Sequence, residues 1–258
     1  MVRLVDTHAH LHDSRFEGKI VEVLEQSSQD ISAVINLGTD FETSQKSLDI
    51  YQNQDYQSII DIYWGAGLHP HHADDLQNLK SVVDLIYQNQ TILVAVGEAG
   101  LDYYYLHATK KNQIRAFVLQ AELAKELDKP LVVHARDAWD NILGVIDDIR
   151  PRGVIHSFTG KVQQVEQLVD LGFYFGISGI ATFIKDQEYL EALRLIPSNR
   201  VVFETDCPYL APVPMRGKLN IPAYQVYTLE FLARLRGEDQ EKLAQMSLNN
   251  TRALFKVK

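Results

Sequence analysis

The feature that most constrains the fold of this chain is a repeated alternation of short apolar segments with longer amphipathic ones. The short segments are rich in β-branched residues, and their length is that of a buried strand. Near-continuous apolar runs are typical of strands covered on both faces, as in parallel sheets. There are eight such runs: VRLVDTH from Val2, ISAVINLG from Ile31, SIIDIYWGAG from Ser58, TILVAVGEAG from Thr91, PLVVHA from Pro130, GVIHSF from Gly153, FYFGIS from Phe173 and VVFETD from Val201.

The segments between these runs have helical spacing. Asp137 is placed to cap the start of a helix over the following residues, and Gly172 is placed to end a later one. In residues 114–128 an apolar stripe is predicted, formed by Phe117, Leu119, Leu123, Ala124 and Leu127.

Eight strands that alternate with helices over about 250 residues predict an α/β fold, a (β/α)8 barrel of the TIM type. The alternative is a doubly wound open sheet, but no glycine-rich nucleotide loop follows the first strand. No linker or shift in composition divides the chain, so residues 1–258 are predicted to form a single domain.

Composition excludes several classes of protein. No apolar run approaches the roughly 18 residues that a membrane span needs, and the first residues lack the order of a signal peptide. The single cysteine, Cys207, fits a reducing compartment, so we expect a cytoplasmic protein without membrane contact, and a monomer. A formal charge of −9 argues against a broad basic nucleic-acid footprint. It does not exclude a phosphate substrate, because bound metal ions can reverse the local field.

Hydrophilic residues close several of the predicted strands. In a barrel of this type the chemistry gathers at the C-terminal ends of the strands, so these side chains should project into one mouth. Imidazoles and carboxylates form a donor set suited to zinc, manganese, iron or magnesium. Six donors exceed one tetrahedral ion and predict two divalent ions that share a carboxylate. The six candidate ligands are His8, His10, Glu98, His134, His156 and Asp206.

Longer motifs make the chain similar to a known family. From Val5 to Phe255 it resembles the TatD family of metal-dependent deoxyribonucleases, which belongs to the amidohydrolase-like barrels. The motifs are DTHAHL, GLHPH, GEAGLDYY, HARDAWD, GVIHSFTG, SGIATF, ETDCPYLAP and NTRALF from Asn250.

The resemblance also implies a division of the ligands between two metals. His8, His10, Glu98 and Asp206 would hold one ion, and Glu98 would bridge to a second one completed by His134 and His156. Many other members of the superfamily use a carboxylated lysine as the bridge. No lysine ends a strand here, which favours the nuclease branch.

The expected chemistry follows from these charges. Two cations about 3.5–4 Å apart deprotonate a bridging water and stabilise the attacking and leaving oxygens of a phosphodiester. Asp206 is the candidate to accept the proton of that water, and His69 is expected to face the phosphate or the leaving oxygen. Arg136 is expected either to bind phosphate or to pair with Asp102 or Glu98.

The remaining histidines and one loop lie outside the predicted metal site. His12, His71, His72 and His107 are expected to be exposed to solvent. In the loop after ETDCPYLAP, family members typically have an arginine and a glutamate where this chain has Leu219 and Ile221. If this loop walls the mouth, the loss of a positive charge weakens binding of long nucleic acid.

The predicted function is therefore a metal-dependent hydrolase of DNA phosphodiesters that uses Mg, Mn or Zn. It would act as an exodeoxyribonuclease on short or single-stranded ends. One alternative is hydrolysis of esters such as aminoacylated tRNA on the same site. The other is a metal-binding scaffold without catalysis.

Overall fold

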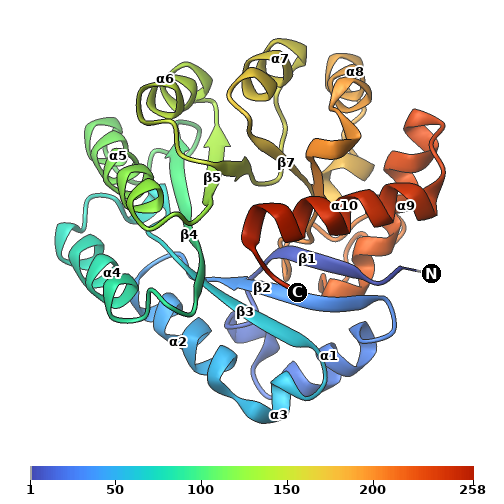
Figure 1. Ribbon diagram of the computed structural model, residues 1–258, viewed down its shortest axis with the longest axis horizontal. Helices are drawn as coiled ribbons and strands as arrows, with labels where there is room; N and C mark the ends of the chain where they lie inside the picture. The colour runs from blue at the N-terminus through green and yellow to red at the C-terminus, as the bar shows by residue number, and fades with distance from the viewer. Residues whose placement is uncertain (1) are drawn as a thin grey trace.

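All eight predicted strands form, and they build one parallel sheet that curls into a barrel (Figure 1). The structure, a computed structural model, describes residues 2–258. Each strand pairs in parallel with the next one in the sequence, so the predicted (β/α)8 barrel is confirmed and the open doubly wound sheet is excluded. The strands are β1 (Leu4–Ala9), β2 (Ile31–Leu37), β3 (Asp61–Ala66), β4 (Leu93–Asp102), β5 (Leu131–Arg136), β6 (Gly153–Ile155), β7 (Tyr174–Ile177) and β8 (Val201–Phe203).

The contact between β8 and β1 closes the barrel through few backbone bonds. Ala9 and Cys207 form a single parallel bridge. The backbone N–H of Asp206 donates to the carbonyl oxygen of His8 at 2.9 Å, and that of His10 donates to the carbonyl of Cys207 at 2.8 Å. We call this contact the seam. It brings residues from the two ends of the chain together beside the pocket described below.

Side chains reinforce the seam. The buried carboxylate of Asp6 accepts hydrogen bonds from the backbone N–H and the hydroxyl of Thr205. The hydroxyl of Thr7 donates to the carbonyl oxygen of Phe203 at 3.1 Å. Burial raises the pKa of Asp6 to about 7, although the bonds from Thr205 oppose that shift. Asp6 therefore connects β1 to the segment that follows β8. His8 and His10, which have the same parity in the sequence, are directed at the pocket described below.

Helices surround the barrel because each buries one apolar face against the sheet (Figure 1). The α-helices are α1 (Ile20–Ser27), α2 (Phe41–Gln52), α3 (Gln54–Gln57), α4 (Leu76–Gln88), α5 (Lys110–Glu126), α6 (Trp139–Ile149), α7 (Val162–Asp170), α8 (Gln187–Leu195), α9 (Gln225–Arg236) and α10 (Gln240–Phe255). Short 3-10 helices are η1 (Ser14–Phe16), η2 (Pro70–His72), η3 (Gly179–Thr182), η4 (Ser198–Arg200) and η5 (Pro222–Tyr224). Among residues 2–258, no helix has the length and apolar character that crossing a membrane requires.

Two local predictions about helices are wrong. Leu119 is exposed, since it lies two residues from the buried Phe117 and so points away from the sheet. Asp137 does not cap α6, because its backbone adopts a left-handed conformation (φ +53°) and Ala138 occupies the cap position without a side-chain bond. Gly172 does follow the end of α7 as predicted, with φ +76°.

The N-terminal end of the barrel is filled with apolar side chains. Helix α10 crosses this end, and the chain's last residues seal it (Figure 1). The barrel interior and the seal form one buried cluster of Ile35, Leu37, Ala95, Val132, Val154, Val202, Leu254, Phe255 and Val257.

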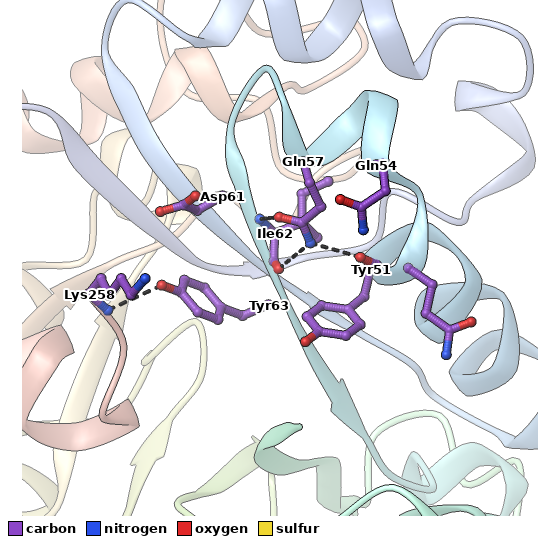
Figure 2. Close-up of a pocket in the computed structure, with 8 residues that line it drawn as sticks. Tyr51, Gln54, Gln57, Asp61, Ile62, Tyr63 and Lys258 are labelled. Carbon is purple, nitrogen blue, oxygen red and sulfur yellow. Dashed lines mark hydrogen bonds between the residues drawn. The ribbon is translucent and has the colours of Figure 1, made fainter. Parts of the chain in front are cut away.

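A surface pocket of about 420 Å³ lies at this same end, beside the start of β3 (Figure 2). Several of its polar groups bond to one another. The side-chain amide of Gln57 donates to the carbonyl oxygens of Tyr51 and Ile62, both at 2.8 Å, and the backbone N–H of Lys258 donates to the hydroxyl of Tyr63 at 3.1 Å. These bonds connect α2, α3 and Lys258 to the start of β3.

Candidate metal centre

The structure brings all six predicted ligands together at the C-terminal ends of the strands. They meet at a pocket of about 370 Å³, which is also lined by Thr39, His69 and Tyr209. His8 is fully buried beside it. The six come from five strands of the barrel: His8 and His10 at the end of β1, Glu98 in β4, His134 in β5, His156 just after β6, and Asp206 after β8.

Glu98 lies between two groups of imidazoles. Its Oε2 atom is 3.4 Å from Nε2 of His8 and 3.7 Å from Nε2 of His10. Its Oε1 atom is 3.0 Å from Nδ1 of His134 and 3.8 Å from Nε2 of His156. The two oxygens of one carboxylate therefore face two different sets of donors.

Glycine at position 97 permits this placement of Glu98. Gly97 has φ +140°, and a Cβ atom there would lie 2.6 Å from the carbonyl oxygen of Val132. Any other residue would be strained by both its backbone conformation and this contact. The sequence GE within GEAGLDYY thus has a local steric reason.

The first donor group contains His8, His10 and Asp206. The Nε2 atoms of the two histidines are only 3.1 Å apart. The Oδ1 atom of Asp206 lies 3.3 Å from Nε2 of His10 and 3.8 Å from Nε2 of His8. Nδ1 of His10 donates to the carbonyl oxygen of Leu37 at 2.9 Å, which leaves the Nε2 lone pair directed at the pocket. Two buried nitrogens this close, flanked by carboxylates, suit a shared cation.

The second donor group contains His134 and His156. Nε2 of His134 lies 3.3 Å from Oδ2 of Asp102, so a proton on Nε2 leaves Nδ1 free to act as a ligand. Nδ1 of His156 lies 2.8 Å from Oε1 of Glu204, which leaves Nε2 free in the same way. In both cases a carboxylate outside the pocket sets the tautomer that a metal requires.

Glu204 is a buried carboxylate beside the candidate ligands that sequence reasoning missed. Its Oε1 atom also accepts a hydrogen bond from the backbone N–H of Ser157. Gly176 makes room for it, because a Cβ atom there would collide with Oε2 of Glu204. The sequence does contain one indication of its position. Glu204 stands two residues before Asp206, at the end of the same apolar run, so both could be expected to face the same side.

The charges of the pocket favour cation binding. Burial raises the pKa of Glu98, but the nearby imidazoles, first those of His69 and His156, lower it further, so the net pKa is well below its ordinary value. The same holds for Asp206. Burial raises its pKa, but the imidazoles of His156 and His10 lower it further, so the net pKa is below its ordinary value. Both groups are therefore carboxylates at neutral pH.

The imidazole of His156 responds in the opposite direction. Burial alone would lower its pKa, but Glu204, Asp206 and Glu98 raise it to about 10. The surrounding carboxylates thus favour a positive charge at this point, and a bound divalent ion would take the place of the proton on Nε2. Four imidazoles with buried carboxylates thus fit divalent cations by donor type and by charge.

His69 is oriented as a hydrogen-bond donor to the pocket. Its Nδ1 atom accepts from the backbone N–H of His71 at 3.2 Å, so its proton lies on Nε2, which is 3.6 Å from Oε1 of Glu98. His69 and His134 could also complete a metal site with Glu98, since their ligand atoms lie within 4.8 Å of one another. The bond to Nδ1 and the resulting Nε2–H argue for the donor role.

The predicted exposure of the other histidines is half right. His72 and His107 are exposed as expected. His71 is not, because its Nε2 atom bonds to Oδ2 of Asp102 at 2.9 Å. His12 is also largely enclosed, and burial lowers its pKa to about 3. Pro70 correctly indicated a turn, but the sequence did not show that this turn directs His71 toward Asp102.

Arg136 pairs with neither Asp102 nor Glu98. Its guanidinium group lies over the rings of Tyr104 and Tyr105, at 4.4 and 4.7 Å from their centroids. The carboxylate of Asp102 is occupied by His134 and His71 instead. The ion-pair alternative for Arg136 is therefore wrong.

The divergent loop does not line the pocket with its two altered residues. Ile221 is buried and Leu219 packs against the core, so their apolar character is explained by packing. Asn220 between them donates to the carbonyl oxygens of Thr205 and Tyr209, at 2.9 and 2.6 Å. The pocket is lined by no residue of this loop, so the expectation that the loop walls the mouth is wrong. Through Asn220 the loop instead supports Tyr209, which does line the pocket.

A (β/α)8 barrel with this donor set at its C-terminal mouth defines a metal-dependent hydrolase. Residues 5–256 match the family model described as TatD related DNase. The chain is 31% identical to the metal-dependent hydrolase YabD of Bacillus subtilis, over 98% of this chain and 99% of that protein. It is 33% identical to the 3'-5' ssDNA/RNA exonuclease TatD of Salmonella typhimurium, over 98% and 99%. The crystal structure of YJJV, a TatD homolog of Escherichia coli, superposes with a TM-score of 0.91 at 29% identity and 99% coverage of both chains. The chain belongs to the TatD family.

Proposed function

We propose that this TatD-family hydrolase cleaves phosphodiester bonds at the ends of single-stranded DNA, using two divalent metal ions held by the six residues above. The observation that carries the proposal is the position of Glu98, whose two carboxylate oxygens face separate groups of imidazoles. A single bridging carboxylate between two donor sets is the arrangement that a two-metal hydrolase needs.

The side chains around the pocket supply the remaining functions. When bound, the cations act as Lewis acids and lower the pKa of water. Asp206 accepts the proton of the attacking water, since it is ionised and partly open to the pocket. The Nε2–H group of His69 donates to the departing oxygen. Both groups act where charge changes during cleavage.

The relatives support a nucleic-acid substrate. TatD of Salmonella typhimurium is named as a 3'-5' exonuclease of single-stranded DNA and RNA, and it aligns along almost the whole of this chain. The pocket is also small, about 370 Å³. An unpaired end can enter such a pocket more easily than the middle of a duplex.

The test is hydrolysis of a labelled single-stranded oligonucleotide by metal-depleted protein to which Mg, Mn or Zn is added back. The wild-type protein should release nucleotides from an end, and Asp206→Asn should slow the reaction by at least about 100-fold, as expected for a lost general base. His69→Ala should slow it while the metal content is unchanged. If aminoacyl esters are hydrolysed and no oligonucleotide is, the phosphodiesterase assignment is wrong.

A further inference from the structure

An exposed tyrosine stands at the edge of the metal pocket and is fixed on every side. Tyr209 is 47% exposed, and it lines the pocket together with His10 and Asp206. Its hydroxyl donates to Oδ2 of Asp13 at 3.2 Å, and the guanidinium group of Arg15 lies 4.2 Å from its ring centroid. The ring is therefore held in place although half of it faces solvent.

The backbone of Tyr209 is held as well. Its N–H donates to the carbonyl oxygen of Asp206 at 2.9 Å, and its own carbonyl accepts from the side-chain amide of Asn220 at 2.6 Å. These bonds connect the backbone of Tyr209 to Asp206 and to Asn220. The ring centroid of Tyr209 is 6.2 Å from that of His10.

A second group of exposed aromatic rings lies across the mouth. Tyr104 and Tyr105 follow β4 and are 60% and 51% exposed. In the strand order β1 to β8, the β4–β5 pair is opposite the seam, which carries Tyr209. The ring of Tyr105 is 5.8 Å from that of His71, which lines the pocket.

Asp102 ties this second group to the metal centre. Its Oδ1 atom accepts from the backbone N–H groups of Tyr104 and Tyr105, at 3.0 and 2.9 Å. Its Oδ2 atom bonds to Nε2 of His134 at 3.3 Å. One carboxylate therefore sets the position of both the aromatic rings and the ligand His134.

Large aromatic rings that face water contribute little to the core, so their fixed positions beside a hydrolytic pocket need another explanation. Every nucleobase has a π-face, and stacking on tyrosine is the usual way in which proteins hold unpaired bases irrespective of sequence. Building on the proposed function, we propose that Tyr209 and the Tyr104–Tyr105 pair are stacking platforms for the bases on either side of the cleaved phosphate.

The two platforms differ in their charge. Arg15 is neutralised by a two-point ion pair with Asp13, with both N–O distances 2.8 Å, so the Tyr209 side offers mainly an aromatic surface. Arg136 lies over the two tyrosines, and among residues 2–258 it has no carboxylate partner, so it can bind the phosphate of the nucleotide stacked there. Bases already stacked within a duplex cannot use either platform, so these residues select single-stranded ends.

The experiment compares a 12-residue single-stranded thymidine oligonucleotide with an abasic oligonucleotide of the same length and backbone. For the wild-type protein, kcat/KM should be about 10-fold or more higher on the thymidine substrate, within the range of one or two stacked bases. In Tyr209→Leu and in the double variant Tyr104→Leu/Tyr105→Leu, this ratio should fall toward one. Tyr209→Phe, which keeps the ring, should retain most of it.

Tyr87→Leu is the matched control, because Tyr87 is an exposed tyrosine on α4 that contacts Glu126 far from the mouth. It should keep the wild-type ratio. If the wild-type protein cleaves both oligonucleotides equally well, or if the leucine variants keep its preference, the stacking proposal is wrong while the proposed nuclease activity stands. If the wild-type protein cleaves neither oligonucleotide, both proposals are wrong.

Discussion

The two ends of the barrel are built from the same eight strands but have opposite chemistry. At the C-terminal end the strands finish in histidines and carboxylates that converge within hydrogen-bonding distance. At the N-terminal end the interior is apolar and is sealed by Leu254, Phe255 and Val257. The two kinds of chemistry are separated because all eight strands run in parallel, so that all their C-terminal ends meet on one side of the barrel.

From this contrast we expect activity and stability to depend on separate residues of the molecule. The mouth concentrates ionisable groups whose burial costs free energy unless they are paired. The sealed end supplies hydrophobic burial without polar groups to satisfy. Variants at the mouth should therefore change catalysis more than unfolding, and variants at the seal should do the reverse.

The largest effect should come from Glu98→Ala. Because its two oxygens face both donor groups, this change should remove both metal ions and reduce hydrolysis below detection. His134→Ala should lose mainly one ion. Elemental analysis of the purified proteins measures the metal content per chain, with His107→Ala, an exposed histidine, as the control. Two ions retained by Glu98→Ala would falsify the assignment of the bridge.

Phe255→Ala should have the largest effect on stability. Phe255 is 3% exposed in the apolar seal, and removing such a ring costs about 3–5 kcal/mol of unfolding free energy. Chemical denaturation measures that loss, while kcat in the cold should match that of the wild type. Met246→Ala, exposed on the same helix, serves as the control. A fall in kcat without a fall in stability would show that the two ends are not separate.

A smaller effect is expected at the rim of the mouth, from Asp13→Asn. The hydrogen bond and charge of Arg15 hold the pKa of Asp13 below its ordinary value of 3.8. A carboxyl group with a lowered pKa stabilises the folded state above pH 3.8 and loses this contribution as the pH falls. The variant should therefore melt slightly below the wild type at pH 7, and the difference should shrink at pH 3. A difference that grows on acidification would contradict this sign.

Much of the barrel could be predicted from the sequence because its signals are local. Every apolar run became a strand, and the hydrophilic residue that ended it could be placed at the mouth by topology alone. The errors arose where a side chain's direction depends on distant contacts. Leu119 was predicted to be buried since nothing local shows that the polar Gln113 and Gln120 face the barrel instead, where they bond to the backbone carbonyls of Asp102 and Leu68.

The residues that orient the ligands were the hardest to predict. From the sequence, Asp102 is expected only as a partner for Arg136. In the structure it bonds to the side chains of His134 and His71 and to the backbone of the loop that carries Tyr104 and Tyr105. These contacts depend on a turn after β4 that directs two backbone N–H groups toward the carboxylate of Asp102. Glu204 was missed because its partner His156 lies on another strand. Such pairings require the three-dimensional register, which one sequence does not contain.

The seam between β8 and β1 has a consequence for the motions of the protein. Here a single bridge between Ala9 and Cys207 replaces the ladders of two or more residue pairs that join the other neighbouring strands. His8 and His10 lie on one side of it and Asp206 on the other. A cation held by all three would act as a crosslink between the first and last strands. Chelation should therefore let the barrel open at this line first, and amide hydrogens of His10 and Asp206 should then exchange faster than those between β2 and β3.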